Sequence, residues 1–118
     1  MIDLRKITGF KGEEIAASFL QERGFDILER NWRCRLGEID IVARKDGKLV
    51  FCEVKTKKND KFGLPEEMIS KQKQQKLKQL ALLYLKENYG QIMPYQIDVL
   101  AVDIKKGEVR HIENAVEE

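Results

Sequence analysis

The chain of 118 residues is long enough for one domain with a single hydrophobic core. Hydrophobic residues make up 42% and charged residues 36%, which excludes a disordered chain, and the net charge of +2 is nearly balanced. No apolar run reaches the ~18 residues of a membrane span, and the N-terminus lacks the apolar core of a secretory signal. Cys34 and Cys52 fit neither a CxxC metal pattern nor a disulfide framework. We therefore expect one cytoplasmic domain over residues 1–118, with no membrane partner.

A first helix is predicted from about Thr8 to Arg23, because Gly24 tolerates the positive φ that often ends a helix. Its apolar face recurs at helical spacing and consists of Ile15, Ala16, Phe19 and Leu20. Gly12 falls on the same face, which would let the helix approach a sheet closely.

Three strands are predicted next, over residues 25–32, 38–44 and 48–56. The second alternates polar and apolar residues, as a half-buried strand does. The third is apolar on both faces until Glu53, which is typical of a central strand. Asp46-Gly47 between them is a strong hairpin signal.

A second helix is predicted from an N-cap at Ser70 to Tyr89, just before Gly90. Its core stripe would be Leu77, Leu80, Ala81, Tyr84 and Leu85. Two further strands are predicted at 95–102 and 109–112. The order of helix, three strands, helix and two strands predicts an α/β domain with a mixed central sheet flanked by helices.

The predicted hairpin has a consequence for charge. A two-residue loop at Asp46-Gly47 pairs Lys45 with Lys48, and this register sets Asp40 opposite Glu53. Opposed like charges destabilise a sheet, so a divalent cation between the two carboxylates is the expected compensation.

The residue types around this pair suit phosphodiester hydrolysis. Carboxylates bind Mg²⁺ or Mn²⁺, which stabilises charge on a phosphate and activates water. Lys55 lies two residues beyond Glu53, on the same side of the strand, where it can serve the nucleophile. Glu13 lies at the edge of the apolar face of the first helix, whereas Glu14 points to solvent. A carboxylate facing a sheet is costly unless paired or bound to metal, so Glu13 is a further candidate ligand.

A simpler interpretation also exists. Lys55 could neutralise Glu38 and Asp40 in a cross-strand salt-bridge ladder that binds no metal. The lysines that follow could likewise be a solvated surface. Alternatively they form a basic field for nucleic acid, with contacts at Lys57, Lys58, Lys71 and Lys73.

Three other residues each have a functional and a structural interpretation. His111 is the only histidine, which argues against a histidine-based zinc site or a Ser-His-Asp hydrolase, and it is expected on a strand surface. Asp98 could face the same cleft as Asp40, although a backbone or lysine partner is the simpler expectation. Trp32 could stack on a base, but core packing is the commoner role of a lone tryptophan.

The motifs resemble the uncharacterised bacterial YraN-type family over nearly the whole chain. The matching residues are Gly9-x-x-Gly12-Glu13, Arg30-Asn31-x-Arg33, Gly37-Glu38-Ile39-Asp40, Phe51-x-Glu53-Val54-Lys55, Phe62-Gly63-x-Pro65, Lys73-Gln74, Ile97-Asp98-Val99 and His111-Ile112-x-Asn114-Ala115. Gly-Glu-Ile-Asp together with Glu-Val-Lys is the most specific part. Cys52 stands where the family often has valine and is expected to fill a small apolar site.

This resemblance implies that the family is a branch of the restriction-endonuclease-like superfamily, which also holds archaeal Holliday-junction resolvases. The fold that it implies is an αβββαβ core. It implies that Asp40 and Glu53 bind metal and act with Lys55 in catalysis, with Glu13 as the helical acid. Lys73 and Gln74 match positions that support the site or touch phosphate in some members. It also makes a homodimer compatible with the sequence.

Three functions follow for testing. The first is a Mg²⁺- or Mn²⁺-dependent endonuclease on DNA, selective for structure rather than sequence. The second is a non-catalytic nucleic-acid-binding module of the same fold. The third is a protein-interaction domain whose acids and lysine form only a salt-bridge ladder.

Overall fold

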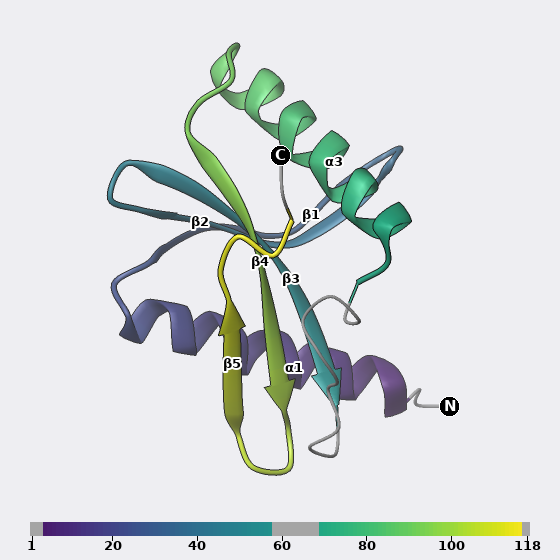
Figure 1. Ribbon diagram of the computed structural model, residues 1–118. Helices are drawn as coiled ribbons and strands as arrows, with labels where there is room; N and C mark the ends of the chain where they lie inside the picture. The colour runs from purple at the N-terminus through teal and green to yellow at the C-terminus, as the bar shows by residue number, and fades with distance from the viewer. Residues whose placement is uncertain (1–3, 58–68, 117–118) are drawn as a thin grey trace.

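The computed structural model describes residues 4–57 and 69–116 (Figure 1). Its elements, in chain order, are α1 (Leu4–Glu22), β1 (Asp26–Cys34), β2 (Gly37–Lys45), β3 (Lys48–Lys57), α3 (Lys71–Tyr89), β4 (Tyr95–Asp103) and β5 (Glu108–Ile112). The chain is an α/β domain with a mixed sheet between two helices, as predicted, and the αβββαβ order is present with β5 added.

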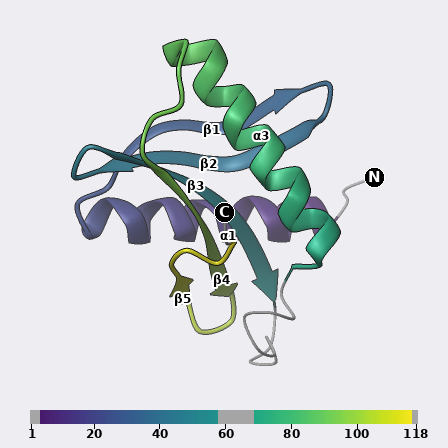
Figure 2. The same ribbon diagram turned by 45° about the horizontal axis from the view of Figure 1, so that its top comes forward.

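The five strands form one sheet in the order β1-β2-β3-β4-β5. Neighbours are antiparallel except for β3 and β4, which are parallel. Parallel neighbours need a long crossover, and α3 belongs to the connection that carries the chain from β3 to β4. Figure 2 shows α3 crossing one face of the sheet while α1 runs along the other.

The β2–β3 hairpin closes as predicted. Its register runs from Lys45–Lys48 to Ile41–Cys52. Asp46 has φ of 52° and Gly47 has φ of 75°, and two positive φ values in a two-residue loop are what a type I′ turn requires. The Asp-Gly signal therefore fixed this register correctly.

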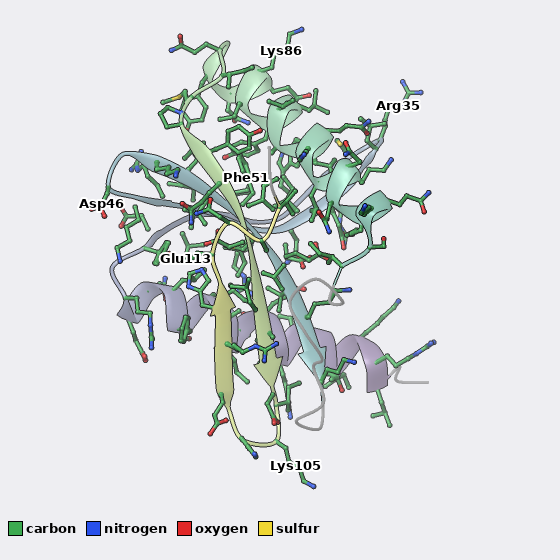
Figure 3. All side chains as sticks on the ribbon, in the orientation of Figure 1. Arg35, Asp46, Phe51, Lys86, Lys105 and Glu113 are labelled. Carbon is green, nitrogen blue, oxygen red and sulfur yellow. The ribbon has the colours of Figure 1, made fainter. Side chains whose placement is uncertain are left out.

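The sheet separates two cores. On one face, residues of α3 such as Leu80 and Leu85 pack with Phe51, which lies beneath α3 in Figure 3. On the other face, Ala16 and Leu20 of α1 pack with alternate residues of β3. The predicted stripe of α3 is buried throughout. Trp32 is 9% exposed, with its ring 5.4 Å from that of Tyr84, so its role is core packing.

The ends of the helices follow their capping residues. The Lys73 N–H donates to Ser70 Oγ at 3.1 Å, and Gly90 ends α3 with φ of 70°. α1 begins at Leu4 rather than at Thr8, so the helix has a first turn that the prediction left out. The apolar residues of this turn, Leu4 and Ile7, are exposed. The predicted break at residues 62–65 lies outside the described residues. Neither α1 nor α3 is long and apolar enough to cross a membrane.

Gly12 is where α1 comes closest to the sheet. A Cβ at this position would lie 1.9 Å from Thr56 Oγ1 and 2.9 Å from Thr56 Cβ, so a side chain fits only if α1 or β3 moves. We expect Gly12→Ala to lower the free energy of unfolding by about 1–3 kcal/mol, measured by urea titration.

Gly9 provides the matched control for Gly12. It lies in the same helix, and a Cβ there would meet nothing within 4 Å. Gly9→Ala should raise stability by roughly 0.5–1 kcal/mol through helix propensity alone. Equal effects of the two substitutions would contradict the close approach at Gly12.

Candidate active site

The site lies where β2 and β3 separate. Their ladder of paired residues ends at Ile41 and Cys52, one residue before Asp40 and Glu53. The Val54 N–H donates to Asp40 Oδ2 at 2.8 Å instead of to a backbone carbonyl of β2. The expectation of a directly paired Asp40 and Glu53 is therefore corrected. The two acids are neighbours, but a carboxylate has replaced the backbone pairing between their strands.

β1 departs from regularity at the same level. Arg30 pairs with Ile41 and Trp32 with Ile39, but Asn31, which lies between Arg30 and Trp32, has a left-handed φ of 54°. Such a φ is uncommon for a non-glycine residue, and asparagine tolerates it better than most. The irregular backbone beside Asp40 could not be predicted from the alternating pattern of its strand.

Glu53 is the most deeply buried of the site acids. Its side chain is 10% exposed. Burial, and then the nearby charge of Asp40, raise its pKa to about 7, although Lys73 and Lys55 act in the opposite direction. Burial likewise raises the pKa of Asp40, while the hydrogen bond from Val54 lowers it. The fold thus holds two carboxylates where their charged forms are disfavoured unless a cation is added.

Glu13 completes the acidic group from the side of α1. It is half-buried, and burial followed by the charge of Asp40 raises its pKa. Its Oε1 atom is buried without a hydrogen-bond partner in the described part of the chain. Glu14 is exposed and pairs with Arg30. The sequence-based choice of Glu13 over Glu14 as the acid turned toward the sheet is confirmed.

Two lysines face these carboxylates. Lys73, in the first turn of α3, places Nζ 3.5 Å from Glu53 Oε1. Lys55 is near enough for its charge to lower the pKa of both Asp40 and Glu53. The sequence placed Lys73 among the nucleic-acid contacts, and the family resemblance placed it among residues that support the site or touch phosphate, but neither named Glu53 as its partner. Only the packing of α3 on the sheet brings residues so far apart in the chain together.

The other predicted nucleic-acid contacts are Lys57, Lys58, Lys71 and Gln74. Lys57 and Lys71 are exposed, so their contacts with nucleic acid stay predictions. The Gln74 amide nitrogen donates to the Ile69 carbonyl at 3.2 Å, which links the first turn of α3 to the residues just before the helix. Lys58 lies outside the described residues.

Glu13, Asp40 and Glu53 do not converge as tightly as a preformed three-ligand cage. Among the residues that the structure describes, three ligand groups come within 4.8 Å of one another at Asp98, His111 and Glu113. Mg²⁺ nevertheless commonly uses one or two carboxylates and completes its shell with water and substrate oxygens. An open acidic cluster therefore suits a metal shared with a phosphate.

Asp98 is completely buried at a separate position in β4. Its Oδ1 accepts the Asn114 N–H at 3.0 Å, and its Oδ2 lies 2.7 Å from His111 Nε2. The Gln96 amide donates to the same carboxylate. These partners support the structural interpretation of Asp98, with a backbone group, an amide and a histidine in place of a lysine.

The prediction of a surface position for His111 was wrong. Its side chain is 12% exposed and lies against the rings of Phe19 and Phe25, at centroid distances of 6.0 and 5.9 Å. The short β5 gave no clear pattern, and the buried carboxylate of Asp98 draws the imidazole inward. Cys52, in contrast, is buried in the α1-facing core as predicted.

Comparison with known proteins decides the family. The model of the uncharacterised protein family UPF0102 matches residues 12–102. The chain belongs to this family. The UPF0102 protein of Lachnoclostridium phytofermentans is 47% identical over 94% of this chain and 93% of its own. The UPF0102 protein of Syntrophomonas wolfei is 42% identical over 91% and 95%.

The UPF0102 match includes every acid and lysine of the candidate site, from Glu13 to Lys73, but ends before His111. One solved structure, an fdxN element excision controlling factor protein from Anabaena variabilis, has a TM-score of 0.42 and 12% identity. The match covers 86% of this chain and 98% of the Anabaena variabilis chain. Because this similarity is low, the fold is described from the helices and strands of this chain alone.

Proposed function

We propose that the chain is a Mg²⁺- or Mn²⁺-dependent nuclease that hydrolyses phosphodiester bonds of DNA, built on a restriction-endonuclease-like core. The observation that carries this proposal is the grouping of Asp40, Glu53 and Glu13 where β2 and β3 separate. Among the described residues, the buried Glu13 Oε1 has no hydrogen-bond partner. Two lysines at the same place provide positive charge for a phosphate.

The donor set fits a hard divalent cation. Asp40 and Glu53 would be ligands through carboxylate oxygens, with Glu13 binding directly or through water. Burial raises the pKa of all three acids, so their charged forms are disfavoured until a cation neutralises them, which supports this assignment. A bound Mg²⁺ or Mn²⁺ supplies stabilisation of charge on the scissile phosphate and a water of lowered pKa.

The two lysines have separate tasks in this proposal. Lys55 lies beside both Asp40 and Glu53, so its ammonium can orient the attacking water and stabilise charge that develops on phosphorus. Lys73 neutralises Glu53 in the metal-free protein. Because it is 39% exposed, it can turn toward a substrate phosphate once another cation occupies the carboxylates.

Cleavage of a panel of labelled DNAs tests the proposal. Duplex, single-stranded, flap and four-way-junction DNA would each be incubated with Mg²⁺, Mn²⁺ or chelator. We expect metal-dependent products from wild type. Glu53→Gln should reduce the rate on the order of a hundredfold or more, because the metal loses a charged ligand. Affinity for DNA measured by gel shift should change little.

The matched control is Glu14→Gln, which removes an exposed acid one residue from Glu13. This variant should cut like wild type. If wild type and Glu53→Gln show the same background cutting, the nuclease proposal fails. Gel shifts in the same panel then separate a nucleic-acid-binding module from a domain that binds no DNA at all.

A further inference from the structure

A groove opens beside the acidic site, between the β1–β2 turn and the start of α3. It has a volume of about 440 Å³ and is lined by Leu36, Gly37, Glu38, Gln72, Lys76 and Leu80, with Ser70 and Lys73 at its α3 end. Figures 1 and 2 both show the turn lying alongside α3, and Arg35 extends outward from the turn in Figure 3.

The groove connects directly to the site through Lys73. This lysine lines the groove and also lies 3.5 Å from Glu53. A DNA strand with its scissile phosphate at Glu53 would therefore pass Lys73 on the way to the groove.

The lining combines apolar surface with polar edges. Leu80 is buried at the bottom, and Leu36 stands at the rim with 48% of its surface exposed. Gly37 has φ of 148°, which favours glycine, and even a Cβ there would reach Leu80 Cδ1 at 3.5 Å. Absence of a side chain at Gly37 thus keeps the groove open down to Leu80.

Some polar groups of the groove lining already have a hydrogen-bond or ion-pair partner within the protein. Glu38 is paired with Arg33 at 2.9 Å, and the Ser70 hydroxyl accepts the Lys73 N–H. Gln72 is exposed, and its amide can both donate and accept. Lys76 adds a positive charge at the same opening.

We propose that this groove binds one unpaired base of the substrate strand, next to the phosphate that is cut. Apolar side chains contact the faces of extruded or single-stranded bases, and an amide and a carboxylate read their edges. In an intact duplex both base faces are stacked and the pairing edge is occupied, so a paired base cannot enter. The substrate class is therefore DNA with an unpaired nucleotide at the cut, which extends the nuclease proposal on which it rests.

Equilibrium binding in chelator tests the groove without any turnover. Fluorescence anisotropy would compare a labelled single strand with the matching duplex, for wild type, Leu36→Ser and Lys76→Gln. We expect Leu36→Ser to weaken single-strand binding roughly five- to tenfold and duplex binding less than about twofold. Lys76→Gln should weaken binding of both the single strand and the duplex, because both carry the phosphates that a lysine contacts.

Two exposed residues of α3 outside the groove serve as controls. Leu82→Ser and Lys86→Gln make the same chemical changes as Leu36→Ser and Lys76→Gln, at positions on α3 that do not line the groove. Both should bind single strand and duplex like wild type. Thermal melting of each variant checks that the fold is intact, and the exposure of Leu36 makes its replacement safe for folding.

The outcomes separate this inference from the nuclease proposal. The base-binding proposal is overturned if wild type does not prefer single strands, or if Leu36→Ser keeps the wild-type preference. Either result would hold even if metal-dependent cutting is found. A preference that Leu36→Ser removes supports the groove even if no cutting is found.

Discussion

Glu53→Gln is expected to remove a pH-dependent loss of stability from the metal-free protein. The pKa of Glu53 is about 7 in the folded chain, against the ordinary value of 4.5 for a solvated glutamate. The folded state therefore holds the proton more tightly, and its stabilisation is complete below pH 4.5 and lost as pH rises through 7. This shift corresponds to about 3 kcal/mol across that interval. Glutamine keeps the shape without the titration.

Urea unfolding in chelator at pH 5 and pH 8 measures this effect. The stability difference between Glu53→Gln and wild type should increase by about 2.5 kcal/mol in favour of glutamine from the lower to the higher pH. Glu14→Gln, at an exposed site, should show no such trend. Parallel pH profiles for wild type and Glu53→Gln would contradict the disfavoured charge at this position.

Added Mg²⁺ or Mn²⁺ extends the same experiment. A cation that binds only the folded state stabilises it by RT ln(1 + L/Kd), where L is the free cation concentration. At pH 8 it should restore much of the stability that wild type loses, and do so far less for Glu53→Gln. No metal-dependent stabilisation of wild type would count against Asp40 and Glu53 as ligands, whatever the cleavage assay shows.

Asp98→Ala is expected to be the most destabilising of these substitutions, by about 3–5 kcal/mol. Asp98 is completely buried and accepts hydrogen bonds from the Asn114 N–H and the Gln96 amide, with His111 Nε2 at 2.7 Å. Alanine leaves all these groups without their acceptor inside the protein, and each unsatisfied donor adds to the loss.

Chemical denaturation at pH 7 checks the effect of Asp98→Ala. Glu113→Ala is the matched control, because Glu113 is an exposed acid in the same cluster and should change stability by less than about 0.5 kcal/mol. A loss of less than about 1 kcal/mol in the free energy of unfolding of Asp98→Ala would show that this hydrogen-bond network does not hold Asn114 and His111 against β4. Losses of similar size for Asp98 and Glu113 would point to a shared role for the cluster instead.

Local sequence signals determined most of the architecture. Ser70 and Gly90 set the limits of α3, and Asp46-Gly47 fixed the β2–β3 register, because each acts through backbone geometry within a few residues. Helical spacing placed Glu13 toward the sheet and Glu14 in solvent. Choosing the candidate acids needed only that register and that spacing.

Tertiary structure decided how these residues meet. Asn31 of β1 has a left-handed φ, and the Val54 N–H donates to the Asp40 carboxylate where β2 and β3 separate, although strict alternation predicts a continuous ladder. Lys73 reaches Glu53 only because α3 packs over the sheet. His111 turns inward because Asp98 is buried beside it. Contacts between distant segments depend on packing and desolvation, which no local pattern of residues encodes.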